Sequence, residues 1–253
     1  MKTFFKRVLG VFCIGCTLSI SASSTPALMP MPATFQMLEG ITTLNSTLAV
    51  YMPKDQQRLL QPLLTNSLFA EQFKRLSWVD KTNAQLQIKV EILAAQLPYL
   101  DMDESYELTI IDNAVTLNSV NQYGMLRGLA TLSQLLFSAD QPLQLANLCI
   151  TDKPTYAWRG LLFDSVRHFL PIKDVKRTLR GLASAKFNVF HWHLTDDQGW
   201  RVELNSYPKL HQLASDGLFY TQQQITDIVA YAASLGMPVA LCLLIQSLEA
   251  VLH

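Results

Sequence analysis

The chain has 253 residues, of which 49% are hydrophobic, so it can bury the core of one large or two medium domains. This composition argues against a disordered chain. Twenty basic residues balance twenty acidic ones, which leaves no electrostatic footprint for nucleic acid or for an anionic membrane surface. A neutral partner such as a sugar is compatible with this balance.

The first residues have the features of a secretory signal peptide. Three basic residues precede an apolar run at 8–20, and small residues follow it. The run of about 13 residues is too short for a bilayer span, which needs roughly 20. We therefore expect residues 1–23 to direct export to the periplasm or the cell exterior, with no membrane association after cleavage. A cysteine at position 16, after Gly15, leaves a lipid anchor as the alternative.

Residues 24–152 are predicted to form a small α+β domain. Its strands are expected at 85–92, 106–111 and 114–117. The first of them alternates polar and apolar residues with period two, and the other two are joined by a turn at Asp112-Asn113. Apolar residues then recur at helical spacing from Tyr123 to Phe137, which predicts a helix packed on that sheet.

After residue 152 the pattern changes to alternating strands and helices. Strands are expected at 158–164 and 188–194, and apolar stripes predict helices around 172–182 and 225–232. Thr221 with Gln224 supplies a capping box for the second helix, and Gly236 supplies its stop. Repeated βα units of this kind indicate a parallel sheet or a barrel.

Polar residues gather at the ends of these two strands, where the loops of an α/β barrel place its active site. They are Asp164, Arg167 and His168 after the first strand, and His191, His193, Asp196 and Asp197 at the second. Tryptophans beside charged groups suit a sugar, whose ring has apolar faces and an equator of hydroxyls. Arg167 can donate to two neighbouring hydroxyls, and Asp196 can accept from one or orient another group.

Each of these residues also has a structural interpretation. Asp164 or Asp197 can cap a helix or pair with Arg167 or Arg201. The three tryptophans are individually expected in the core rather than in a sugar platform: Trp158, Trp192 and Trp200.

His191 and His193 lie two apart on a strand and therefore project from one face. They can be core residues, or they can bind a metal as paired ligands do in some barrel hydrolases. A metal-dependent barrel hydrolase using His191 and His193 is thus one alternative function.

Two long runs carry a resemblance to a known family. Residues 158–169 (WRGLLFDSVRHF) and 186–201 (KFNVFHWHLTDDQGWR) resemble the opening of the catalytic barrel of bacterial β-N-acetylhexosaminidases, glycoside hydrolase family twenty. Residues 104–108 and 128–132 are similar to the domain that precedes that barrel. The resemblance covers roughly residues 82–239.

The resemblance implies an α+β N-terminal domain (24–152) followed by the first part of an α/β TIM barrel (153–239), about two and a half of eight βα units. It implies exo-hydrolysis of terminal N-acetylglucosamine or N-acetylgalactosamine with retention, the substrate's own acetamido oxygen acting as nucleophile. Arg167 would bind ring hydroxyls, with His193 and Asp196 in the polar network around it. The partners would be oligosaccharides or glycoconjugates containing N-acetylhexosamine, and no metal or other cofactor is implied.

The resemblance ends after Val239. In the family the third strand leads into a Pro-Glu…Asp…Pro-Gly-His segment, and a catalytic Asp-Glu pair follows further on, whereas residues 240–253 show neither. We expect this divergent tail to mark a truncated chain, for which a frameshift is one hypothesis. The chain then contains no catalytic residue and is expected to be inactive. A non-catalytic remnant whose upstream domain folds is the other alternative function.

Two cysteines remain after the expected signal peptide, Cys149 and Cys242, and their separation does not say whether they pair.

Overall fold

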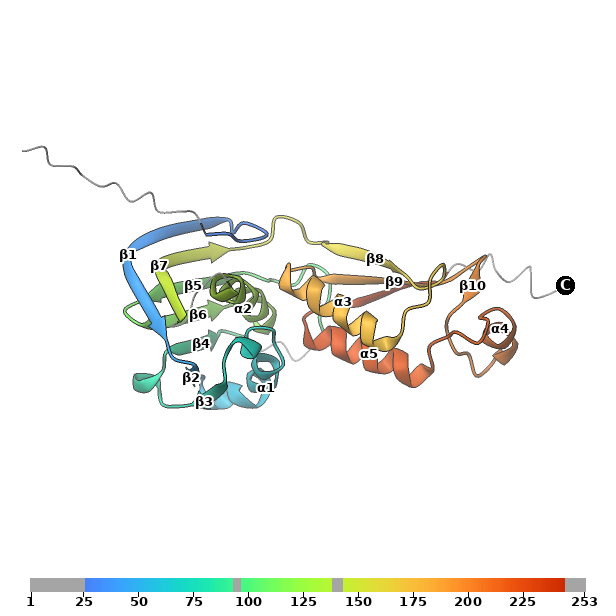
Figure 1. Ribbon diagram of the computed structural model, residues 1–253, viewed down its shortest axis with the longest axis horizontal. Coiled ribbons are helices and arrows are strands. Elements are labelled where there is room, and N and C mark those ends of the chain that lie inside the picture. The colour runs from blue at the N-terminus through green and yellow to red at the C-terminus, as the bar shows by residue number, and fades with distance from the viewer. Residues whose placement is uncertain (1–25, 93–96, 138–142, 244–253) are drawn as a thin grey trace, which may run out of the picture.

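The computed structural model describes residues 26–92, 97–137 and 143–243. The expected signal peptide, with the cysteine at position 16, and residues 244–253 of the expected tail lie outside these ranges. The described chain forms two sheets with their helices, arranged one after the other along the long axis (Figure 1). Within these ranges no helix is long and apolar enough to cross a membrane.

The N-terminal domain is built on a seven-stranded sheet in the order β1-β7-β5-β6-β4-β2-β3. Its strands are β1 (Thr34–Leu44), β2 (Thr47–Tyr51), β3 (Arg75–Trp78), β4 (Leu86–Val90), β5 (Tyr106–Ile111), β6 (Ala114–Ser119) and β7 (Leu143–Asp152). Two helices, α1 (Lys54–Thr65) and α2 (Gln122–Phe137), and two 3₁₀ turns, η1 (Ala70–Gln72) and η2 (Lys81–Asn83), complete it. The three predicted strands and the helix are confirmed, while β1, β2, β3, β7 and α1 were not individually predicted.

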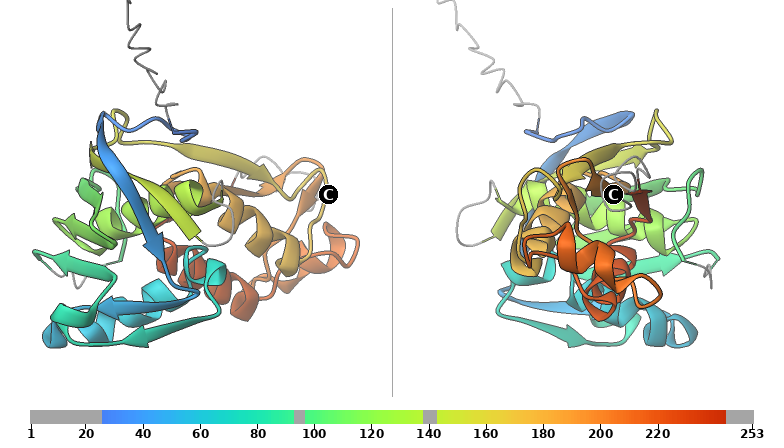
Figure 2. Two further views of the ribbon diagram at one scale, coloured as in Figure 1. Left: turned by 60° about the vertical axis from the view of Figure 1, so that its left-hand side comes forward. Right: turned by 90° about the vertical axis from the view of Figure 1, so that its right-hand side faces the viewer.

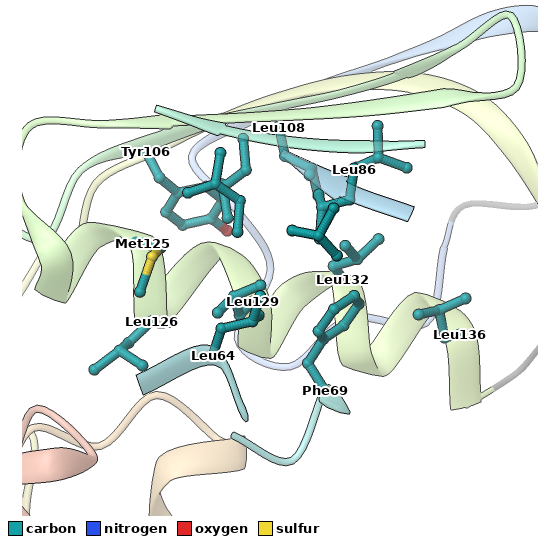
Figure 3. Packing of buried hydrophobic residues seen from close by; sticks show 14 of the residues in the cluster. Leu64, Phe69, Leu86, Tyr106, Leu108, Met125, Leu126, Leu129, Leu132 and Leu136 are labelled. Atoms are coloured by element: carbon teal, nitrogen blue, oxygen red, sulfur yellow. The ribbon is translucent and has the colours of Figure 1, made fainter. Parts of the chain in front are cut away.

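Helix α2 packs closely on this sheet, and its apolar residues meet those of the strands in the core (Figure 3). Two glycines permit the close approach. A Cβ at Gly124 would lie 2.2 Å from the Ser105 carbonyl oxygen, and one at Gly128 would lie 2.3 Å from the Leu117 side chain. The sheet is therefore joined to its helix at positions where only glycine fits.

The β5–β6 hairpin confirms the predicted turn. Ile111 pairs with Ala114 across it, and both intervening residues have positive φ, 52° at Asp112 and 59° at Asn113. Asp and Asn tolerate this left-handed conformation, which matches the twist of the flanking strands.

The second sheet contains three parallel strands, β8 (Gly160–Asp164), β9 (Val189–Asp196) and β11 (Val239–Leu243), with β9 in the middle. Helices α3 (Ile172–Ser184) and α5 (Gln222–Ser234) connect them and lie on one side of the sheet (Figures 1 and 2). The short strand β10 (Gly199–Trp200) folds back on β9, and α4 (Pro208–Leu213) lies in the loop that follows. The predicted succession of βα units is confirmed.

The ends of α5 follow the sequence signals. The Thr221 hydroxyl accepts from the Gln224 N–H at 3.2 Å, the Gln224 side chain accepts from the Thr221 N–H at 3.0 Å, and Gly236 has φ +73°. Strand β11 then continues past Val239 to Leu243, because the apolar residues after position 239 extend the strand. The expected change at residue 240 is thus not a break in backbone structure.

The tryptophans divide between core and surface. Trp192 is fully buried and Trp200 nearly so, as predicted, but Trp158 is 50% exposed. The prediction for Trp158 was wrong because this residue lies in the segment before β8 and not in the strand itself, where its side chain stays half accessible.

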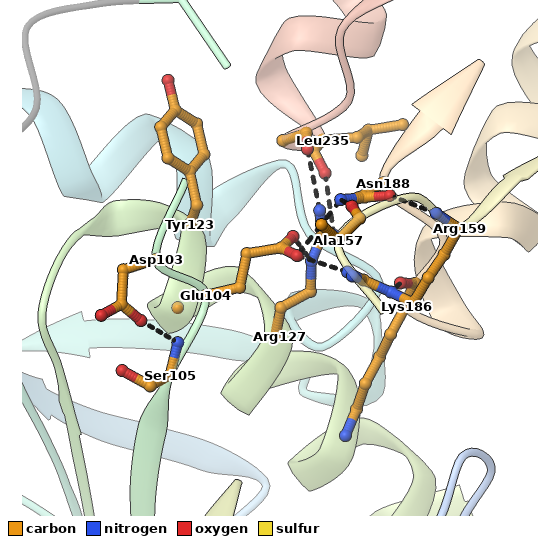
Figure 4. A network of polar contacts seen from close by, with 12 residues as sticks. Asp103, Glu104, Ser105, Tyr123, Arg127, Ala157, Arg159, Lys186, Asn188 and Leu235 are labelled. Carbon is orange, nitrogen blue, oxygen red and sulfur yellow. Dashed lines mark hydrogen bonds and ion pairs between the residues drawn. The ribbon is translucent and has the colours of Figure 1, made fainter. Parts of the chain in front are cut away.

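A buried carboxylate joins the two domains (Figure 4). Glu104 forms ion pairs with two arginines: its Oε1 lies 2.6 Å from Arg127 Nε, and its Oε2 lies 2.5 Å from Arg159 Nη2. The side-chain amide of Asn188 also donates to Glu104 Oε2, at 3.3 Å. Arg127 comes from α2 and continues across the junction to donate to the Gly236 carbonyl at 2.8 Å, just after α5. Charges removed from water must be paired, so this network fixes both domains relative to one another.

A second buried network lies where β7 ends. Lys186, which follows α3, contacts Asp152 at 2.9 Å and the Tyr106 hydroxyl at 2.9 Å, and Tyr106 also donates to Asp152. Although burial opposes it, the charge of Lys186 and its hydrogen bond hold the pKa of Asp152 below its usual value. Asp152 is the last residue of β7, so this contact ties the end of the first sheet to the segment after α3.

Replacement of Glu104 tests the junction. The Glu104→Gln variant leaves Arg127, whose side chain is 2% exposed, without its charged partner, so we expect a loss of about 3–5 kcal/mol in the free energy of unfolding. Urea denaturation followed by circular dichroism measures this loss. The matched control is Glu107→Gln on the exposed face of β5, and equal stability of the two variants would contradict the assignment.

Candidate functional site

The candidate site lies at the carboxyl ends of β8 and β9, which are adjacent parallel strands. Asp164 ends β8 and pairs in register with His193 of β9, and Asp196 ends β9. Because successive strand residues point to opposite faces, Trp192 packs into the helix-covered core while His191 and His193 take the opposite face. Tertiary structure thus assembles residues from two motifs about 30 positions apart at one edge.

The three predicted substrate-binding residues are in direct contact. One carboxylate oxygen of Asp196, Oδ2, lies 2.6 Å from Arg167 Nη2 and 3.0 Å from His193 Nε2. Asp196 Oδ1 accepts from the Asp197 N–H at 2.8 Å. The carboxylate is therefore a shared acceptor that fixes an arginine from the loop after β8 and a histidine of β9.

Arg167 has two further partners. Its Nη1 donates to Asp164 at 2.8 Å, and its Nε donates to the side-chain oxygen of Gln198 at 2.8 Å. Asp164 also accepts from the backbone N–H groups of Val166 and Arg167. The pairing of Asp164 with Arg167, considered from the sequence as a structural role, is thus present.

The Arg167 guanidinium remains accessible despite these contacts, since its side chain is 51% exposed. Gln198 was not among the predicted site residues. Its sequence signal is its place in the run 186–201, two residues after Asp196, and the turn between β9 and β10 brings it to Arg167.

Both carboxylates of the site favour the ionised form. The backbone N–H of Asp197 and the His193 side chain hold the pKa of Asp196 below its usual value, with a further contribution from Arg167. At Asp164, burial opposes the shift, but hydrogen bonds from the Arg167 backbone and side chain still lower the pKa. At neutral pH the site presents a positively charged donor held between two carboxylates.

His193 is 4% exposed, and its Nδ1 has no hydrogen-bond partner among the described residues. His191 is only partly buried on the same face. Across the described ranges, no three His, Cys, Asp or Glu side chains are grouped so that they could hold a metal ion. The metal alternative therefore finds no support in the arrangement of these side chains.

The loop around the site is braced by buried groups. Arg201 donates to the carbonyls of Ser215, Leu218 and Val166, so its role is to tie loops together rather than to pair with Asp197. Ser165, between the site residues, receives the indole N–H of Trp192 and the hydroxyl of Tyr220. These contacts fix the backbone of residues 165 and 166, directly before Arg167.

Two other sequence features are resolved by their positions. Cys149 and Cys242 are free and belong to different sheets, so they do not form a disulfide. The only adjacent Asp-Glu pair in the sequence, Asp103-Glu104, lies in the N-terminal domain. Its glutamate forms ion pairs with Arg127 and Arg159 at the domain junction and therefore does not lie at the strand ends of the candidate site.

The architecture is thus a sheet-and-helix domain followed by parallel βα units whose polar residues meet at the carboxyl ends of the strands, as in α/β-barrel enzymes. Residues 156–241 match the catalytic domain of glycosyl hydrolase family 20, and residues 38–135 match a "beta-acetyl hexosaminidase like" domain. The chain belongs to glycosyl hydrolase family 20.

Curated relatives and solved structures agree with this membership. A β-hexosaminidase from Akkermansia muciniphila is 42% identical over 57% of this chain and 31% of the relative. One from Porphyromonas gingivalis is 31% identical over 90% of the chain and 33% of the relative. The chitobiase structure from Flavobacterium johnsoniae matches with a TM-score of 0.74 at 37% identity, covering 85% of this chain and 34% of that one. The chain spans about a third of the length of these proteins.

The charge network can be tested by carboxyl NMR. Arg167→Gln removes a positive charge and side-chain donors, so we expect the pKa of Asp164 and of Asp196 to rise, with the larger rise at Asp164. Because their pKa values are lowered in the folded state, both carboxylates stabilise the fold above their usual pKa, and this contribution is lost as the pH falls through the folded-state values. Arg177→Gln, on the exposed surface of α3, is the matched control; unchanged titrations in Arg167→Gln would refute the network.

Proposed function

We propose that this chain carries the sugar-binding half of an exo-β-N-acetylhexosaminidase site, which accepts a terminal N-acetylglucosamine or N-acetylgalactosamine. The proposal rests on one observation above all. In a chain of this family, an exposed arginine is held at the carboxyl ends of β8 and β9 by two ionised carboxylates, Asp164 and Asp196.

The geometry suits the recognition of sugar hydroxyls. A guanidinium presents its donors in a rigid plane, so once its orientation is fixed it can serve two neighbouring hydroxyls. Asp164, Asp196 and Gln198 fix that orientation before any ligand arrives. The fixed orientation lowers the entropy cost of binding, and His193 in turn holds Asp196 in place.

The chemical step requires groups other than these. In the mechanism that the family implies, the substrate's acetamido oxygen attacks the anomeric carbon, so the enzyme supplies no nucleophile. An aspartate orients the acetamido group, and a neighbouring glutamate gives its proton to the leaving oxygen and later activates water. Neither Arg167 nor His193 and Asp196 would perform these steps. We therefore propose that binding and chemistry belong to separate parts of the full site.

The first expectation concerns turnover. The purified 253-residue polypeptide should not release p-nitrophenol from p-nitrophenyl N-acetylglucosaminide, because its strand ends offer no Asp-Glu pair. A full-length family member assayed in parallel is the positive control. Turnover that co-purifies with the chain through successive columns would refute this expectation.

The second expectation concerns binding, which does not depend on the chemistry. N-acetylglucosamine should perturb the amide NMR signals around Arg167 and Asp196, and Arg167→Gln should weaken binding about tenfold or more, since a hydrogen bond from a charged donor contributes about 1.5–3 kcal/mol. Arg177→Gln should bind like the wild type. Equal affinity of all three proteins would remove Arg167 from the proposed site.

A further inference from the structure

Cys242 is a free thiol on the face of the second sheet that carries the candidate sugar site. It lies in β11 and pairs in register with His193 of the adjacent parallel strand β9. Adjacent strands lie about 4.8 Å apart and in-register side chains leave the same face, so the thiol lies beside the imidazole. Cys242 is also partly exposed. A small reagent can therefore reach its sulfur from solvent without having to reach the buried histidine.

The two nitrogens of His193 have different surroundings. Nε2 lies 3.0 Å from Asp196 Oδ2. Hydrogen bonds hold the pKa of Asp196 below its usual value, so its carboxylate is an acceptor and Nε2 is the donor. In a neutral imidazole, Nδ1 then carries the lone pair. Nδ1 is buried and accepts no hydrogen bond from any residue of the described ranges.

Two side chains flank His193 in register, and only one of them can supply a proton. Asp164 of β8 accepts from Arg167 and from the Val166 N–H, and as a carboxylate it has no proton to donate. Cys242 of β11 carries an S–H donor that turns about a single bond. A buried acceptor without a donor is costly, so the thiol gains by directing its proton to Nδ1.

We propose that Cys242, His193 and Asp196 form a triad that makes Cys242 a nucleophile toward small, uncharged disulfides. A nucleophile beside a base that is oriented by a third group is the arrangement that activates thiols and hydroxyls in enzymes. The carboxylates of Asp164 and Asp196 on the same face disfavour an anionic reagent. This thiol chemistry is separate from the sugar binding proposed above, and its test requires no sugar.

The reaction exchanges one disulfide for another. The thiol proton of Cys242 moves to His193 Nδ1 while the sulfur attacks one sulfur of the reagent. The S–S bond of the reagent breaks, and the departing thiolate takes the proton from Nδ1 and leaves as a thiol. Cys242 is thereby oxidised to a mixed disulfide, and the released half of the reagent is reduced.

The test uses bis(2-hydroxyethyl) disulfide, which is small and uncharged. The 253-residue chain is incubated with it at pH 7, quenched with acid and digested, and the modification of each cysteine is followed by mass spectrometry. Cys149 of β7, also free and partly exposed, is the internal reference. An ordinary thiol is only a few per cent ionised at this pH, so we expect Cys242 to react about three- to tenfold faster than Cys149.

Variants of the other two triad residues separate activation from exposure. His193→Gln should slow Cys242 about three- to tenfold, and Asp196→Asn, which keeps the side-chain shape but removes the charge, should slow it in the same direction. Cys149 should react at an unchanged rate in both, since only a general opening of the fold would accelerate it. His168→Gln in the exposed loop after β8 is the matched control. Equal rates of the two cysteines in the wild-type chain, or a Cys242 rate unchanged in both variants, would overturn the proposal.

Discussion

The carboxylate of Glu104 is the group on which the relation between the two domains depends. It sits in the loop before β5, nearly inaccessible to solvent, and takes one arginine from α2 and another from the segment that leads into β8 (Figure 4). Such a group is tolerated in the interior only when its hydrogen bonds are satisfied from several directions. These contacts therefore fix the position of the first barrel strand relative to the N-terminal domain.

This constraint extends to the βα units through Arg127. Its guanidinium binds the carbonyls of Leu235 and Gly236, where α5 ends and the chain turns toward β11. Cations are favoured near the carboxyl end of a helix, where main-chain carbonyls lack partners. A residue of the N-terminal domain thus fixes the entry into the third parallel strand, and the domain acts as a support for the barrel rather than as a separate attachment.

The candidate sugar site is likewise held together by ion pairs between neighbouring segments. Arg167 is oriented by Asp164 and Asp196, and Asp196 is itself held by His193. Each charge has a partner, yet the guanidinium stays accessible at the strand ends. Hydrogen bonding keeps the pKa of both carboxylates low, so the arrangement persists at neutral pH. A polar site that is ordered before ligand arrives is suited to a neutral, hydroxyl-rich partner.

The sequence by itself determined the local structure that rests on short-range signals. Period-two alternation identified β4, the Asp112-Asn113 dipeptide identified the β5–β6 turn, and a capping box and a glycine set the ends of α5. It also named Arg167, His193 and Asp196, because long runs around them resemble one family. Tertiary structure alone decided the seven-stranded sheet, the exposure of Trp158 and the contribution of Gln198. It alone revealed the Glu104 junction and the position of Cys242 beside His193, since these depend on contacts between segments far apart in the chain, which no local pattern encodes.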